Sequence, residues 1–138
     1  MSETEKIIRF LREFPGWGDA PLRTDCTDAA PESFGLYPKG QEVYKRREDV
    51  TGTVTISCRS RYLLRRMAKC REEENARWLQ ALTDWVQQES AVGRVPALGD
   101  GYTRLRAENG KLKSRDQAGT AVYELDLIAE YEMIYKGE

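Results

Sequence analysis

The chain has 138 residues, of which 40% are hydrophobic and 33% are charged. This length suits one domain with a single core, and the composition is that of a folding chain rather than a disordered one. The 22 basic and 23 acidic residues give a net charge of -1, which excludes a global basic field for holding nucleic acid. We therefore expect a single folded domain over residues 1–138.

The chain contains no histidine, which removes the commonest general base and the commonest metal ligand. Its three cysteines, Cys26, Cys58 and Cys70, are widely spaced and form no CxxC pair, as in reduced intracellular proteins. The sequence has neither a signal-like start nor an apolar run of about 18 residues. We expect a cytoplasmic protein without a membrane span, and we predict no catalytic, cofactor-binding or metal-binding residues.

An amphipathic helix is predicted over Glu3–Phe14. Ser2 and Glu5 have the spacing of a capping box, apolar residues then recur at helical intervals, and Pro15 ends the run. The apolar stripe of this helix should pack against a sheet.

Residues 15–41 are rich in glycine and proline, which predicts an irregular, loop-rich stretch. Only short strands are expected there, at Leu22–Cys26 and Ser33–Tyr37. Two roles are open for Trp17, which lies between two glycines: a plug in the core or an exposed anchor for a partner. The core role is favoured.

Alternating apolar and polar residues predict a strand from Val50 to Leu64. Its apolar face carries Val54, Ile56, Cys58 and Tyr62. Arg59 and Arg61 lie on its polar face, and Glu48–Gly52 should form the turn that pairs it with the preceding strand. This is a typical half-buried antiparallel strand.

A long helix is predicted over Cys70–Glu89, followed by a connector over Val95–Gly101 that is too rich in glycine and proline for regular structure. The apolar stripe of the helix is Trp78, Leu79, Leu82, Trp85 and Val86. Two short strands are predicted next, at Thr103–Ala107 and Lys111–Arg115. Asn109-Gly110 is a strong signal for a two-residue turn between them.

The final run, Thr120–Tyr135, alternates most clearly. One face carries Tyr123, Leu125, Leu127, Ala129, Tyr131, Met133 and Tyr135, and the other carries Glu124, Asp126, Glu130 and Glu132 around Ile128. A period of two predicts a strand with one buried face and one solvated acidic face that titrates ordinarily. At roughly 50 Å, such a strand should bend or project beyond its domain, and a projecting edge invites pairing with another subunit.

These elements predict an α+β domain whose mostly antiparallel sheet is packed on one face by an N-terminal helix and a longer central helix. If the two best strands are neighbours, Arg59 and Arg61 should pair with the acids of the final strand. The basic cluster around them, from Arg59 to Arg71, is the best nucleic-acid candidate, but a protein-contact surface is favoured because no binding motif accompanies it. The predicted interface residues are Arg59, Arg61, Arg65, Arg66, Glu124, Asp126, Glu130, Glu132 and Trp17.

Three passages, in this order, carry a resemblance to a known family. They are SFGLYPKG at Ser33–Gly40, then RSR with the helix NARWLQALTDWVQQES and GRVPALGDG through Gly101, and finally AVYELDLIAEYEMIY. Together they resemble the small minor capsid or tail-terminator proteins in the neck of long-tailed bacteriophages and their prophages. The similarity spans most of the chain from Ser33 on, through loose patterns of fold and packing.

The resemblance implies a structural protein without enzymatic activity, whose α+β subunits form a ring, typically a hexamer, that caps the tail tube. The implied partners are further copies of the chain, the tail-tube protein and the head-tail connector proteins. The implied locations are the host bacterial cytoplasm during assembly and then the virion neck. Other connector or tail-tube subunits, a small-molecule-modifying enzyme and a nucleic-acid-binding regulator stay open as alternatives, although specific nucleic-acid binding is not expected.

Overall fold

Five strands form one sheet in the order β1-β2-β3-β5-β4 in a computed structural model, which describes residues 1–28 and 31–137. The strands are β1 (Leu22–Thr24), β2 (Ser33–Glu48), β3 (Val54–Lys69), β4 (Arg104–Arg115) and β5 (Thr120–Tyr135). The short β1 runs parallel to β2, and the pairs β2–β3, β3–β5 and β4–β5 are antiparallel. The predicted α+β class with a mostly antiparallel sheet is confirmed.

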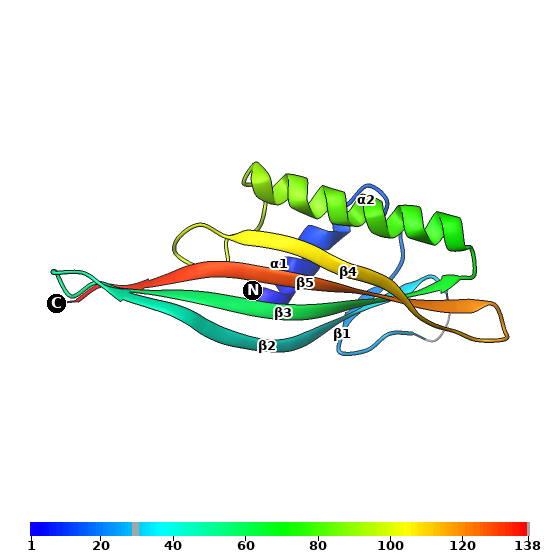
Figure 1. The fold of residues 1–138 in the computed structure, drawn as a ribbon, viewed down its shortest axis with the longest axis horizontal. Coiled ribbons are helices and arrows are strands. Elements are labelled where there is room, and N and C mark those ends of the chain that lie inside the picture. Colours follow the sequence, from blue (N-terminus) through cyan, green and yellow to red (C-terminus); the bar gives the residue numbers. More distant parts are fainter. Residues whose placement is uncertain (29–30, 138) are drawn as a thin grey trace.

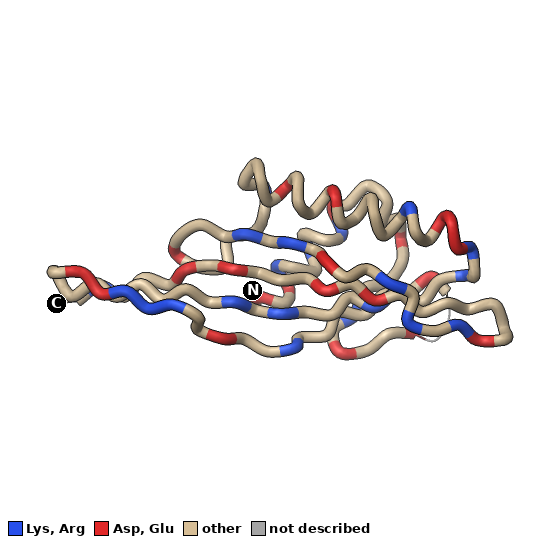
Figure 2. The backbone as a smooth tube through the Cα atoms, in the orientation of Figure 1, with Lys and Arg blue, Asp and Glu red and all other residues tan. Residues whose placement is uncertain are grey.

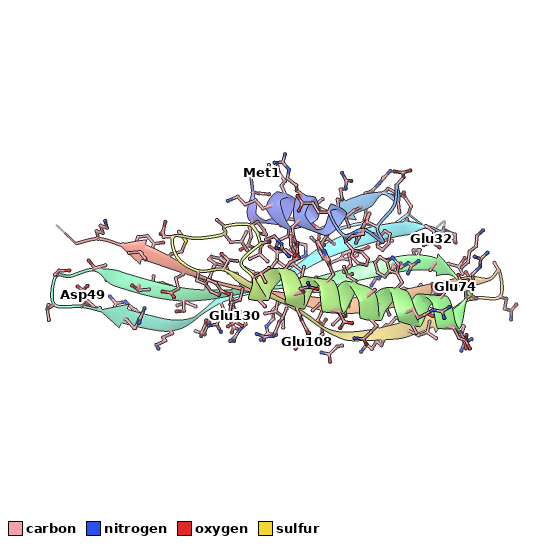
Figure 3. The ribbon with its side chains drawn as sticks, turned by 90° about the horizontal axis from the view of Figure 1, so that it is seen from above. Met1, Glu32, Asp49, Glu74, Glu108 and Glu130 are labelled. Carbon is pink, nitrogen blue, oxygen red and sulfur yellow. The ribbon has the colours of Figure 1, made fainter. Side chains whose placement is uncertain are left out.

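Two helices, α1 (Glu3–Arg12) and α2 (Glu72–Ala91), lie side by side over one face of this sheet (Figures 1 and 3). Ser2 caps α1 as predicted, because its Oγ accepts a hydrogen bond of 3.1 Å from the Glu5 N–H. The rings of Phe10 and Trp85 stack with centroids 4.7 Å apart and so join the two helices. Both helices begin and end within two residues of the predicted bounds.

The core lies between the helices and the alternate residues of β3 and β5 that face them. Leu82 and Val86 of α2 are fully buried there, and Leu125 and Leu127 of β5 are buried beneath them. The period of two in β5 thus predicted the buried face correctly as far as Tyr131.

Three strands continue beyond the helices and form what we call the projecting ribbon, residues 43–57 and 132–137. It contains the ends of β2, β3 and β5 and the turn between β2 and β3, and it leaves the rest of the molecule at the end where Asp49 is labelled (Figure 3). Asp49 closes this turn, since its Oδ1 accepts hydrogen bonds from the backbone N–H groups of Thr51 and Thr53. The expectation that the last strand would bend or project is met by projection.

β2 is much longer than predicted, because the chain continues as a strand from Tyr37 to Glu48 instead of becoming irregular. Its register shifts between Pro38 and Gly40 and again between Val43 and Lys45. Proline is tolerated at such a shift on an edge strand, where no ladder hydrogen bond is lost. Residues 33–41, predicted to be mostly irregular as the end of the stretch 15–41, instead belong to β2. Residues 29 and 30 of that stretch lie outside the described residues.

The predicted turn at Asn109-Gly110 is wrong, because β4 is one continuous strand through this point. The pairing with β5 shifts register between Glu108 and Lys111, so the two residues form a bulge. Asn109 has φ 58, the left-handed conformation that hairpin turns and bulges share. The local signal was real, and the pairing of the flanking residues with β5 decided between the two outcomes.

Candidate assembly surface

Charged residues alternate in sign from strand to strand across the sheet (Figure 2). The registers place Arg59, Arg61, Glu124 and Glu130 together on the face opposite the two helices. Arg59 of β3 lies between Glu42 of β2 and Glu130 of β5, with a guanidinium nitrogen 3.2 Å from each carboxylate. The register makes these three residues direct cross-strand neighbours. The predicted pairing between the arginine-rich strand and the acidic strand is confirmed.

Glu130 is the centre of this charged network. Its carboxylate accepts hydrogen bonds from Arg59, Arg106 and Tyr44, and its side chain is only 17% exposed. Burial opposes ionisation, but these hydrogen bonds outweigh it and lower the pKa of Glu130. The expected solvated face with ordinary titration is wrong here, because long arginine side chains on both sides cover the carboxylate.

Glu124 is also covered rather than solvated, with 8% of its side chain exposed. Arg65 donates to it through Nε at 3.1 Å and through Nη2 at 2.9 Å. The guanidinium of Arg65 lies in turn over the ring of Tyr37, 4.9 Å from its centroid. The pair of Arg65 and Glu124 therefore joins β3 to β5 and leaves little of the carboxylate exposed to a partner.

Arg61, Asp126 and Glu132 are the more accessible members of the predicted interface set. Their partners are Glu42, Asn109 and Arg47, at 3.5, 3.0 and 3.4 Å. Exposed pairs of this kind contribute about 0 to 1 kcal/mol, so they can exchange partners at little cost. These three side chains remain available to a neighbouring molecule.

Arg66 and Trp17 belong to the opposite face, under the helices. Arg66 lies over the ring of Trp78 at 4.3 Å and donates to Glu32 at 2.9 Å, and its side chain is only 12% exposed. Trp17 is buried, with its ring centroid 4.1 Å from that of Phe34. Trp17 is thus a core residue, and its alternative as an exposed anchor is wrong.

The basic cluster from Arg59 to Arg71 does not form one exposed stripe. Arg59 and Arg65 are tied to acids on one face of the sheet, whereas Arg66 lies on the other. A nucleic-acid backbone needs several accessible cations along one path. This arrangement counts against the nucleic-acid alternative.

The outer edge of β2 is open beyond Leu36. β1 pairs with β2 only as far as Leu36, and among the described residues no strand lies beyond Pro38–Glu48. The N–H and C=O groups of an edge strand can pair with another chain. At the opposite edge of the sheet, α2 lies beside β4, and the N–H of Leu105 donates to Ser90 Oγ of α2 at 2.9 Å.

The opposite side of the projecting ribbon is closed by the connector between α2 and β4. The pairing of β4 with β5 begins at Arg104 and Glu130, and past this point Asp100 of the connector replaces β4 as the neighbour of β5. The Asp100 N–H donates to Glu132 O, and Asp100 Oδ2 accepts from the Ile134 N–H, both at 2.8 Å. Gly99 allows this approach, because a Cβ there would lie 2.2 Å from Glu132 O. The ribbon is therefore open along β2 and closed along β5.

A groove of about 600 Å³ runs between α2 and β4. Its apolar lining includes Leu79 and Leu112, and its charged lining is mixed: Glu72, Glu108, Lys111 and Arg115. The bulge at Asn109-Gly110 forms part of it, and Gly110 lies against Leu125 and Leu79. This groove and the ribbon are at opposite ends of the molecule, as the positions of Asp49 and Glu74 show (Figure 3).

The thiol of Cys58 has a structural role. Cys58 is buried, and burial raises the pKa of its thiol, so it packs as a small apolar residue.

Within residues 1–28 and 31–137, no three carboxylates or thiols are placed to hold a metal ion. Neither described helix is long and apolar enough to cross a membrane.

Sequence reasoning missed two regions of the surface, residues 41–48 of β2 and the α2–β4 groove. Both faces of β2 are exposed there, so the sequence has no apolar alternation to mark a strand. The groove depends on how α2 packs beside the bulge, which a linear pattern does not encode. The bulge signal at Asn109-Gly110 was the only local indication of it.

Comparison with protein-family models gives no match for this chain, and comparison with curated proteins gives no match either.

Proposed function

We propose that this protein is a structural subunit of the head-tail neck of a phage or prophage, a tail terminator whose copies form a closed ring, typically a hexamer, on the tail tube. The observation that carries the proposal is the projecting ribbon, with its open β2 edge. The proposal also rests on the resemblance of the three sequence passages to that family. Further copies of the chain, the tail-tube protein and the connector proteins are its partners.

A ring-forming subunit needs two different surfaces that fit one another, because a closed ring is built from head-to-tail contacts. The ribbon supplies an extended surface outside the core, with exposed side chains such as Val43 and Tyr135. The exposed and weakly paired charges Arg61, Asp126 and Glu132 add groups that can re-pair between subunits.

The carboxylates of the sheet favour this structural role over the enzyme alternative. General acid-base chemistry needs a carboxyl group whose pKa lies near the working pH. The pKa of Glu130 is instead lowered by its arginine and tyrosine partners, and Glu124 is bound by two nitrogens of Arg65. Both carboxylates are held by arginines as parts of a charged surface.

Electron microscopy of the purified protein, with and without tail tubes, tests the proposal. The expected result is rings of uniform size that bind at tube ends and stop further tube growth. Sedimentation that shows only monomer at high protein concentration, in low and high salt, would contradict it. Binding along a tube, or growth of tubes from this protein alone, would favour the tail-tube alternative.

A further inference from the structure

We propose that the projecting ribbon of one subunit docks into the α2–β4 groove of a second copy of this chain, in a head-to-tail contact. This inference deepens the proposed function and rests on it, because it names the two surfaces that would close the ring. It uses two accessible features of the described residues, the ribbon and the groove, neither of which is needed to complete the core.

The ribbon carries an apolar face that extends past both helices. Val43, Ile56 and Met133 lie on the side of the sheet that faces the helices elsewhere, since they continue the register of Cys58 and Tyr131. The Val43 side chain is 60% exposed, and Ile56 and Met133 are only partly covered. A contiguous apolar face outside the core is typical of an interaction surface.

The groove has the shape and chemistry to receive such a face. Residues 72–83 of α2 form one wall and span about 18 Å at about 1.5 Å per residue. Residues 43–48 of the ribbon span about 20 Å at about 3.3 Å per residue, so the two lengths match. Leu79 and the partly exposed Leu112 offer apolar contacts inside the groove.

The charges at the two ends are complementary. Arg46 is exposed on the ribbon and lies on the same face as Val43, because its register partner is Ile56; its carboxylate partner Glu48 is 3.7 Å away. Glu73 is exposed on α2, at helical spacing from the groove residues Ala76 and Gln80.

The β4 wall of the groove carries Lys111 and Arg115 beside Glu108, so the acidic side of the groove is the first turn of α2, residues 72–74. Contact of Arg46 with this acidic turn of the next copy favours unlike ends over contact between two ribbons.

Opposite positions in the molecule make this contact heterologous. Asp49 marks the tip of the ribbon and Glu74 marks the far end of the molecule, beside the start of the groove (Figure 3). A subunit with unlike complementary ends adds to its neighbour by a repeated rotation, which closes into a ring or continues as a filament. The occupant of the groove is thus the ribbon of the next subunit.

Two single substitutions test the inference by sedimentation equilibrium. Val43→Asp places a charge on the ribbon face, and Ala76→Arg fills the groove from α2, where arginine keeps a high helix propensity. Each should raise the dissociation constant for self-association at least tenfold while the thermal melting curve stays unchanged. The matched controls are Val92→Asp, at a side chain 55% exposed outside the ribbon, and Ala81→Arg, exposed on α2 outside the groove lining, and both should associate like the wild type.

Mixing the two variants gives the sharpest readout. Val43→Asp retains an intact groove and Ala76→Arg retains an intact ribbon, so a one-to-one mixture should form a heterodimer of wild-type affinity that grows no further. No heterodimer from two monomeric variants would overturn the inference. Wild-type rings that persist in both variants would overturn it and leave the proposed function standing, whereas a wild-type chain that never associates would overturn both.

A charge exchange provides an independent check. Arg46→Glu and Glu73→Lys should each weaken association several-fold at low salt, and the chain that carries both should regain it, because the unlike charges are restored between neighbours. Equal weakening of the double variant, with no recovery, would contradict the pairing of these two ends.

Discussion

The half of the sheet under the helices and the projecting ribbon are built from the same strands, yet they differ in what covers them. Leu127 and Met133 lie on the same face of β5, three alternate positions apart. Leu127 is sealed beneath the helices, whereas Met133 is only partly covered. Alternation therefore identifies the strand and its apolar face, and the extent of the helices decides whether that face is core or surface.

The largest expected effect separates these two positions. Leu127→Asp removes about 1.5 to 3 kcal/mol of burial and adds the cost of an unpaired buried charge, a large share of a total stability of about 5 to 15 kcal/mol. We expect this variant to be unfolded in circular dichroism at room temperature.

The control for Leu127→Asp is Met133→Asp in the ribbon. This change should lower the free energy of unfolding by less than about 1 kcal/mol in urea titrations, because water already reaches the side chain. Equal destabilisation of the two variants would mean that the ribbon belongs to the core.

A smaller effect should come from the charged face, through Glu130. Glu130→Gln leaves Arg59 and Arg106 without their shared carboxylate and should cost about 1.5 to 3 kcal/mol in chemical denaturation. The folded pKa of Glu130 lies below its ordinary value of 4.5. Its stabilising contribution is therefore complete above about pH 4.5 and is lost as the pH falls through the folded pKa.

The pH dependence offers the discriminating measurement for Glu130. The free energy of unfolding of the wild type should fall on acidification below about pH 4.5 more steeply than that of Glu130→Gln. Parallel curves for the two proteins would show that the arginine contacts do not hold this carboxylate ionised.

The smallest of the expected effects concerns the closed side of the ribbon. Gly99→Ala places a Cβ 2.2 Å from Glu132 O and should displace the connector, at a cost of about 1 to 2 kcal/mol. Gly101→Ala is the matched control, since its nearest contact would be 3.4 Å. Hydrogen exchange at Ile134 N–H should become faster in the first variant and stay slow in the second.

Most of the fold was predictable from the sequence because the two helices and the strands β3 and β5 each bury one regular face. The cap at Ser2 and the alternation of β5 both follow from local chemistry and were confirmed. The length of β2 was missed because Gln41–Glu48 is exposed on both faces, so burial imposes no pattern on it. Asn109-Gly110 was misassigned because its left-handed residue serves a bulge as well as a turn.

The candidate surface was predictable in part. Opposite charges on neighbouring strands indicated the pairs around Arg59 before the register was known. The depth at which Glu124 and Glu130 lie could not be predicted, because it depends on arginine side chains from adjacent strands folding over them. Arg66 was grouped with its sequence neighbours, although a period of two places it on the other face with Trp78.

The hydrogen bonds of Asp100 to β5 make the two edges of the ribbon different, because only the β5 edge is covered by them. A sheet that accepts strands on both sides can extend without limit, as amyloid does. Here a strand added along β2 finds no counterpart across the ribbon, since the Gly99-Asp100 connector already occupies the backbone of Glu132 and Ile134. One glycine and one carboxylate thus block the addition of a strand along the β5 edge of the ribbon and leave its β2 edge free.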